Sequence, residues 1–145
     1  MNLKELLISQ KIEKVEKSDF NLEKSDLDLK VADNNFENKN YEWALSIGYS
    51  AILRAGLNLM SFLGYRAKGK EHHKNVFLFL KTFKKFEGLA NYFDRIRRKR
   101  NEFVYRGFDE ISKSESHEVL GKAKEFVSEI RTFVSEIRTG EKNEN

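Results

Sequence analysis

Residues 41–63 form the most apolar stretch of the chain, and this stretch constrains the fold more than any other. Its apolar residues follow a helical repeat along two sides, one through Leu45 and Leu59 and the other through Ile47 and Leu57. Such a helix is stable in water only when other parts of the chain cover both sides. We therefore expect residues 41–63 to be the central helix of the fold.

Small residues recur along this stretch at steps of three or four positions, at Ala44, Gly48, Ala51 and Ala55. They allow a neighbouring helix to approach closely, and a large side chain at Gly48 would overpack that contact. Gly64 follows directly and predicts the end of the helix.

Most of the remaining chain also has apolar residues at helical spacing. Proline is absent, and the charged fraction of 34% exceeds the roughly 25% of an average protein, which favours helices with charged, solvated faces. Residues 27–31 alternate as in a strand, but length and charge favour a helix there too. We predict an all-α fold, an antiparallel helical bundle of five or six helices without a sheet. The other predicted helices are residues 3–15, 19–38, 75–86, 89–107 and 113–140.

Capping and turn residues predict where these helices begin and end. The predicted boundaries are an N-cap at Ser18 or Asp19, a turn within residues 34–40, a basic loop at residues 66–74, a break at Gly88, a capping box at Ser112 and Glu115, and an end at Gly140. We expect residues 1–140 to form one domain and residues 141–145 a disordered tail.

The segments 126–132 and 133–139 are identical, each reading FVSEIRT. Their apolar residues have the spacing of a coiled coil, but two or three heptads are few for one that stands alone. We expect this helix to dock on the core of the bundle.

The chain has no cysteine, which excludes a disulfide framework and a thiolate zinc site and suits a reducing compartment. Its first residues hold too few apolar side chains for a signal peptide or a membrane span, so we expect a cytoplasmic protein. No nucleotide-binding glycine loop, zinc-protease motif or serine nucleophile motif is present.

Positive charge is concentrated in residues 66–106, which hold 13 Lys or Arg and four Asp or Glu, a net charge of +9 in a chain whose total is +4. The remainder is therefore acidic. This asymmetry indicates a basic surface for a polyanion and a separate acidic surface.

The basic residues are densest in residues 94–107. Read as a helix, this segment places Arg97, Asn101 and Tyr105 on one polar face, whereas Arg100 falls within the apolar stripe. A guanidinium group there must be paired, must face another subunit, or must reach out of the core along its stem.

A plainer interpretation of the same segment is a solvated face whose charges pair locally. Arg98 has the helical spacing to pair with Asp94 or Glu102, and Arg106 can also pair with Glu102. Arginines in a cluster are equally suited to bidentate contacts with phosphate, so both interpretations remain open at this point.

His72 and His73 are adjacent, so on a helix they point about 100° apart and are poorly placed to hold one metal ion. The ligand sets of known metal sites are missing, and we expect neither a metal nor another cofactor. Capping of the helix start, or a contact to the basic surface, is the better account of these histidines.

Three parts of the sequence together resemble the HEPN superfamily of helical domains over residues 23–134. NYEWALSIGYSAILRAGLNLMSFLG is similar to the long helix of the family, KGKEHHKNVFLFLK to the start of its next helix, and RRKRNEFVYRG to its hallmark motif. In that motif an Arg, often followed by Asn, precedes a His by about four to six residues. Arg100 matches the Arg and Asn101 the Asn, but Tyr105 stands where the His is expected.

The resemblance implies a helical homodimer in which two motifs line one basic cleft that binds RNA or nucleotide phosphate. Nuclease members of the family are metal-independent RNases that use Arg and His, so Arg100 and Tyr105 are the candidate catalytic residues. Tyr, with a pKa near ~10, is a poor base at neutral pH but can donate a hydrogen bond or stack on a base.

Arg97, Arg98, Asn101 and Arg106 are the candidate phosphate-binding residues. The resemblance further implies a possible nucleotidyltransferase partner, as in toxin and antitoxin pairs. The alternative hypothesis is a non-catalytic helical dimer that binds an acidic protein partner.

Overall fold

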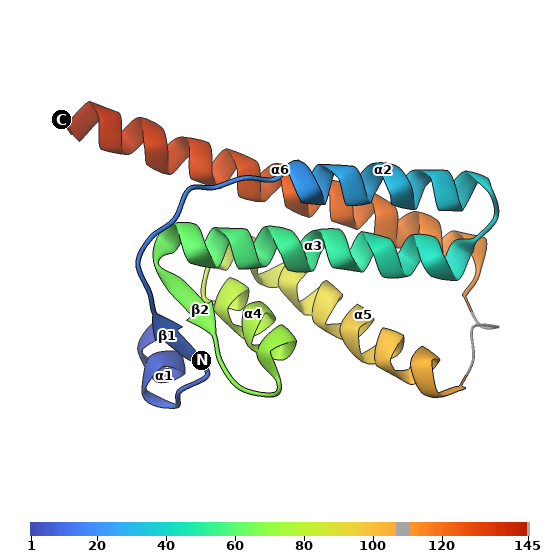
Figure 1. The fold of residues 1–145 in the computed structure, drawn as a ribbon, viewed down its shortest axis with the longest axis horizontal. Coiled ribbons are helices and arrows are strands. Elements are labelled where there is room, and N and C mark those ends of the chain that lie inside the picture. Colours follow the sequence, from blue (N-terminus) through green and yellow to red (C-terminus); the bar gives the residue numbers. More distant parts are fainter. Residues whose placement is uncertain (107–110, 145) are drawn as a thin grey trace.

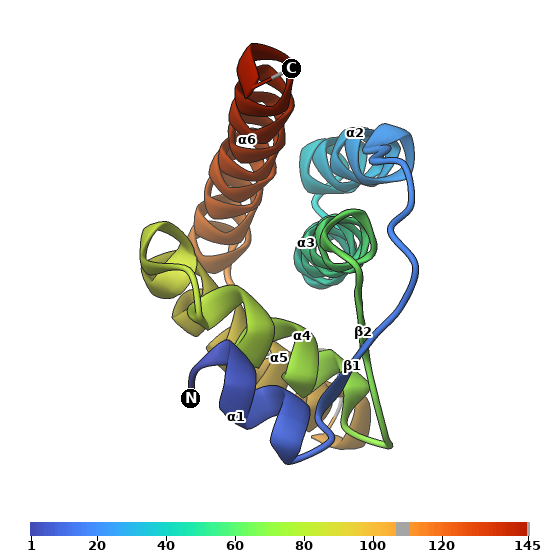
Figure 2. The same ribbon diagram turned by 90° about the vertical axis from the view of Figure 1, so that its left-hand side faces the viewer.

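The apolar stretch of residues 41–63 is a single helix, α3 (Tyr41–Leu63), with the bounds that the sequence predicts. The computed structural model describes the backbone of residues 1–106 and 111–144 and the side chains of residues 1–101 and 111–140. In it, α3 lies between two layers of helices (Figures 1 and 2). Helices α2 (Glu23–Glu37) and α6 (Lys113–Glu144) cover one side of it. Helices α4 (His72–Lys81) and α5 (Glu87–Arg106) cover the other. The predicted bundle around one central helix is therefore confirmed.

The apolar lines of α3 are buried to different extents. Leu45, Ile52 and Leu59 are fully enclosed by the main core, whereas Ile47 is half-buried and Leu57 is 37% exposed. The second line, which also includes Trp43 at 51% exposure, is thus only partly covered. Gly64 adopts a left-handed conformation with φ of 89° and ends α3, as predicted.

Two glycines of α3 lie at close contacts with neighbouring helices. A Cβ atom added at Gly48 would lie 3.0 Å from Leu120 of α6, which confirms the close helix contact expected there. A Cβ atom at Gly56 would lie 2.8 Å from Val76 of α4. The contact with α4 is therefore the tighter of the two.

The prediction of a fold without a sheet is wrong in one place. After the short helix α1 (Leu3–Ile8), strand β1 (Ile12–Lys14) pairs antiparallel with β2 (Tyr65–Ala67). The helix predicted for residues 3–15 therefore ends early. The loop predicted for residues 66–74 begins with a strand. The left-handed Gly64 turns the chain back from α3 into β2, and the backbone of Val15 continues the pairing by donating to the Gly64 carbonyl. Burial of Ile12, which is only 1% exposed, stabilises the sheet.

Several predicted helix boundaries also move. Helix α2 begins at Glu23, where the Asn21 side chain accepts from the Glu23 amide, and not at Ser18 or Asp19. The break before α5 falls at Phe83, whose backbone is extended, and a 3-10 turn, η1 (Lys84–Phe86), leads directly into α5. Gly88 therefore lies inside α5 and does not separate two helices. Phe83 and Phe86 set this position because both rings pack against Phe133 of α6.

Helix α6 begins with the predicted capping box, in which the Ser112 hydroxyl accepts from the Glu115 amide at 3.0 Å. The repeated heptads dock on the core through Phe126, Ile130 and Val134, each at most 1% exposed. The helix continues through Gly140 to Glu144, so the predicted end at Gly140 is wrong. Within the described part of the chain, no helix is both long and apolar enough to cross a membrane.

The tight contact at Gly56 predicts that a larger residue at this position destabilises the fold. Replacing Gly56 with Leu should lower the free energy of unfolding by about 1–3 kcal/mol, because the new side chain must displace Val76 and Leu80. Urea denaturation measures this change. The matched control is Gly121→Leu in α6, where an added Cβ meets nothing within 4 Å and where Leu should stabilise the helix by about 0.5–1 kcal/mol. Equal effects at the two positions would contradict the close packing of α3 and α4.

Candidate functional site

The basic residues of α5 that face the core meet α3 and α4 on the side of the molecule opposite α2 (Figure 1). Arg97 donates from Nε to Asp94 Oδ1 at 3.0 Å, and Lys81 of α4 donates from Nζ to Asp94 Oδ2 at 3.2 Å. Asp94 thus pairs with these two cations and not with Arg98. Burial alone would raise the pKa of Asp94, but the hydrogen bonds from Arg97 and Lys81 hold that pKa below its usual value.

Arg100, which the sequence places in the apolar stripe of α5, is paired within its own chain. Its Nε donates to the Ser46 hydroxyl of α3 at 2.8 Å, and its guanidinium carbon lies 5.1 Å from the centre of the Tyr49 ring. A cation over an aromatic face is an attractive arrangement that offsets part of the cost of burying the charge. The position of Arg100 therefore requires no second subunit.

Arg97 and Arg100 lie three residues apart on α5, so both are on the same side of the helix. The helical count in the sequence assigned them to different faces, but the structure brings them together against α3 and α4. In both side chains the Nε–H group is held by the protein, by Asp94 or by Ser46. A guanidinium carries four further N–H groups on its two terminal nitrogens, so each arginine is oriented while keeping a second set of donors. We call Arg97 and Arg100 the arginine pair.

Tyr49 packs beneath the guanidinium group of Arg100. It is 1% exposed, and its hydroxyl has no hydrogen-bond partner among the side chains that the structure describes. Burial raises the pKa of Tyr49 to about 12, although the charges of Arg100 and Arg97 act in the opposite direction. Tyr49 is therefore neutral at physiological pH and serves as a packing surface for Arg100.

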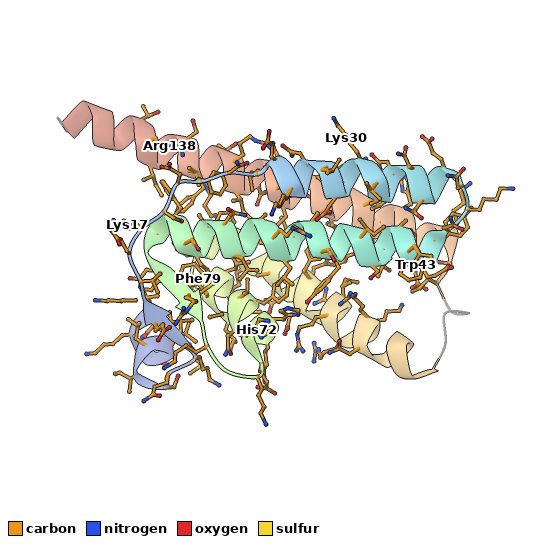
Figure 3. All side chains as sticks on the ribbon, viewed as in Figure 1. Lys17, Lys30, Trp43, His72, Phe79 and Arg138 are labelled. Carbon is orange, nitrogen blue, oxygen red and sulfur yellow. The ribbon has the colours of Figure 1, made fainter. Side chains whose placement is uncertain are left out.

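His73 lies at the start of α4, within reach of the charges of the arginine pair. It sits one helical turn before Phe77, whose ring centre is 6.0 Å from that of Tyr49. Burial lowers the pKa of His73, and the charges of His72, Arg100 and Arg97 lower it further. The imidazole is consequently neutral at pH 7. Figure 3 labels the adjacent His72, which is exposed at the same helix start and whose ring centre is 4.3 Å from that of His73.

The other predicted site residues are less enclosed. Arg98 and Asn101 are exposed on α5. The backbones of Tyr105 and Arg106 belong to the last turn of α5, but their side chains lie outside the described residues. The contact between the histidines and the basic surface stays a prediction, although the charges of Arg100 and Arg97 act on the pKa of His73. Ser46, Tyr49 and Lys81, which hold the arginine pair and its partner Asp94, were missed because they come from other helices.

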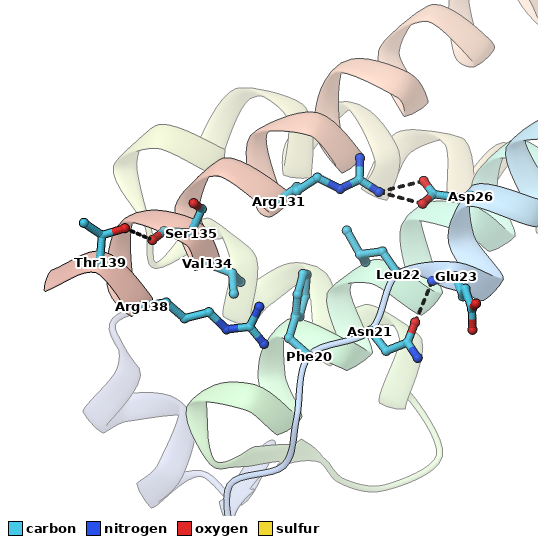
Figure 4. Close-up of a pocket in the computed structure, with 10 residues that line it drawn as sticks. All are labelled: Phe20, Asn21, Leu22, Glu23, Asp26, Arg131, Val134, Ser135, Arg138 and Thr139. Carbon is cyan, nitrogen blue, oxygen red and sulfur yellow. Dashed lines mark hydrogen bonds and ion pairs between the residues drawn. The ribbon is translucent and has the colours of Figure 1, made fainter. Parts of the chain in front are cut away.

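A groove with charged residues also lies elsewhere on the molecule. It has a volume of about 490 Å³ and runs between the segment that leads into α2 and the second half of α6 (Figure 4). Its two arginines are already engaged, since Arg131 holds both carboxylate oxygens of Asp26 and Arg138 lies over the ring of Phe62 at 5.4 Å. We favour the surface around the arginine pair, because Arg97 and Arg100 are each oriented there through a single N–H group.

No cluster of three or more metal-ligating side chains occurs among the residues whose structure is described. What the arrangement around the arginine pair offers is oriented N–H donors, positive charge and a neutral imidazole. These groups are suited to a ligand with phosphate oxygens.

Comparison with known proteins adds one finding. The model of the HEPN domain family matches residues 18–133, which is most of the chain. No curated protein and no solved structure matches the chain.

The lowered pKa of His73 predicts how stability depends on pH. The unfolded chain binds the proton of this imidazole more readily than the folded chain, so stability should be lost as the pH falls below about 6.5 towards the folded-state pKa. His73→Gln should remove part of this loss while changing little at pH 8. Thermal unfolding of both proteins between pH 5 and 8 measures the difference, and parallel curves would show that folding does not shift the pKa of His73.

Proposed function

The chain belongs to the HEPN domain family, and from that premise we propose that it binds RNA or nucleotide phosphate through the arginine pair. The observation that carries this proposal is the way Arg97 and Arg100 are held. Asp94 and Ser46 take one N–H group of each arginine, so the two guanidinium groups are oriented before a ligand arrives. Side chains that are already ordered lose less conformational entropy on binding.

The charge around the pair also favours a polyanion. Asp94 is shared between Arg97 and Lys81, so one carboxylate offsets two cations, one from α4 and one from α5. The exposed Arg98 adds charge next to the pair, and exposed Asn101 can hydrogen-bond a phosphate or a sugar. Arg106, one turn further along α5, extends the basic surface in this proposal. An acidic protein partner is the alternative ligand, and the binding experiment below distinguishes the two.

Whether the chain also cleaves RNA depends on the group that moves the proton. In the family motif that group is a His, and Tyr105 stands at its position in this sequence. We propose that Arg100 stabilises charge on a phosphate and that Tyr105 donates a hydrogen bond or stacks on a base. Cleavage, if it occurs, needs no metal ion in this scheme.

A homodimer and a nucleotidyltransferase partner remain proposals that rest on the family alone. Arg100 gives them no independent support, because Ser46 and Tyr49 of the same chain account for its position.

Removing Arg100 should weaken RNA binding. Arg100→Ala should lower the affinity for a single-stranded RNA by on the order of ten- to a hundred-fold, because charge-assisted hydrogen bonds are lost. It should also reduce the slope of log affinity against log salt by about 0.7 for each phosphate contact that is lost. Fluorescence anisotropy over a range of salt concentrations measures both quantities.

The matched control for this experiment is Lys30→Ala. It removes the same charge from α2, on the other side of α3 (Figure 3), and should leave binding nearly unchanged. Equal affinities of Arg100→Ala and wild type at moderate salt would overturn the proposal. Tight binding of an acidic peptide with no binding of RNA would favour the alternative.

Restoring the family motif should increase cleavage. Tyr105→His introduces a group that titrates near neutral pH, and general acid–base catalysis of this kind contributes about 10²–10⁴-fold. We expect the variant to cleave RNA at least tenfold faster than wild type in the presence of EDTA, as measured with an end-labelled oligonucleotide. Tyr105→Phe is the control and should not accelerate cleavage. Equal rates for Tyr105→His and Tyr105→Phe would show that position 105 does not take part in proton transfer.

A further inference from the structure

We propose that the second half of α6 carries a docking groove for an acidic helical segment of another protein, in which Arg138 receives a carboxylate of the partner. The groove is separate from the arginine pair, so its occupancy does not depend on the proposed binding of RNA. A series of ion pairs between α2 and α6, which stops one step before Arg138, points to it.

Helices α2 and α6 pack side by side in opposite directions, and ion pairs join them at intervals of seven residues (Figure 1). Lys124 of α6 pairs with Asp33 of α2 at 2.9 Å. Seven residues further along α6, Arg131 holds both carboxylate oxygens of Asp26, at 2.8 and 2.6 Å, and Asp26 lies seven residues before Asp33. Because seven residues are almost two turns of a helix, these side chains remain on the facing sides of the two helices.

Arg138 is the next cation in this series. It follows Arg131 by seven residues and occupies the same position in the second FVSEIRT segment. The matching position before Asp26 is Asp19, but α2 begins only at Glu23, and α6 continues past this start (Figure 1). Among the side chains that the structure describes, none forms an ion pair with Arg138.

The contacts of the segment before α2 keep Asp19 from completing the series. The amide of Ser18 donates to the carbonyl of Ser61 at 3.0 Å, and the ring of Phe20 packs edge-on against Phe62 with centres 5.9 Å apart. Both partners lie in the last turn of α3, so this segment is tied to α3 and is not wound as a further turn of α2. The carboxylate opposite Arg138 is therefore left for another molecule to supply.

The Arg138 side chain is oriented for such a contact. Its guanidinium carbon lies 5.4 Å from the centre of the Phe62 ring, so the face of the group is covered while its N–H groups remain along the edge. Figure 4 shows the side chain extending from α6 towards Phe20 across the groove of about 490 Å³. Leu22 and Val134, at 6% and 1% exposure, form apolar parts of the lining. A helix with a carboxylate at the edge of an apolar stripe fits these groups.

The charges around this part of α6 indicate which kind of acidic partner fits. A second hollow, of about 500 Å³, is lined by Phe62 and Ile137, and the charged side chains of the two hollows balance. The cations are Lys17, Arg131 and Arg138, and the carboxylates are Asp19, Glu23 and Asp26. A surface without net charge does not attract a polyanion such as RNA, whereas a single carboxylate opposite Arg138 is favourable. We therefore expect a protein segment in the groove and not a nucleic acid.

The test uses a synthetic, fluorescein-labelled peptide with the sequence of α2, EKSDLDLKVADNNFE, because its Asp26 and Asp33 already pair with α6 in the fold. Fluorescence anisotropy measures its binding to the full chain. We expect Arg138→Ala to weaken binding by about tenfold, the scale of a hydrogen bond between charged groups. Asp26→Asn and Asp33→Asn together in the peptide should cost a similar factor with wild type and nothing more with Arg138→Ala.

The matched control is Lys124→Ala. It removes the cation at the equivalent position of α6, whose carboxylate is supplied by Asp33 of the same chain, and should change the affinity for the peptide by less than about twofold. Reversing the charges gives a second readout that a structural role of Arg138 would not produce. Arg138→Glu should restore binding of a peptide that carries Asp26→Lys and Asp33→Lys.

Equal affinities of wild type and Arg138→Ala for the peptide would overturn the inference. Tighter peptide binding by Asp19→Asn would also do so, because the chain's own carboxylate would then fill the groove. A dimer that Arg138→Ala dissociates in sedimentation would assign the groove to a second copy, and loss of RNA binding by Arg138→Ala would assign it to RNA, each against the inference. Because Arg100→Ala tests RNA binding and Arg138→Ala tests peptide binding, either proposal can fail without the other.

Discussion

Both sides of α3 must be removed from water, and this requirement organises the molecule. Helices α2 and α6 close over one side, and α4 and α5 over the other, so each outer helix is placed by its contact with the same central element. Close approaches occur at Gly48 and Gly56, where no side chain holds the neighbouring helix away. Because α4 and α5 are both fixed against α3, residues that are distant in sequence meet at their junction.

The packing of the helices determines how the two members of the arginine pair are held. Ser46 and Tyr49 belong to the central helix, yet the first accepts a hydrogen bond from Arg100 and the second supports its guanidinium group. Asp94 joins α4 to α5 by pairing with Lys81 as well as with Arg97. Tyr49 is part of the core and Ser46 lies on the same helix, so a change in the packing of α3 would also change the direction of Arg100.

These relations also explain what the sequence could and could not predict. The bounds of α3 follow from its apolar pattern and from Gly64, which are local signals, and the family resemblance located Arg100 and Asn101 through a short motif. The pairing of β1 with β2 joins Ile12 to Ala67, and strands of three residues are too short to leave a periodic pattern. The anchor of Arg100 on Ser46 is 54 residues away along the chain, so no local signal identifies it. The left-handed Gly64, in contrast, was predicted as a helix end but not as the turn into a strand.

The residues that match the family begin at residue 18, which leaves α1 and β1 outside the shared scaffold. Leu6 and Ile12 of this segment are almost fully buried in the same core as Val76 and Phe79 of α4. The first residues of the chain therefore act as an outer brace for α4, the helix that carries His73. Without these residues, apolar side chains of α4 would be more open to solvent, so the environment of α4 depends on a segment outside the part of the chain that matches the family.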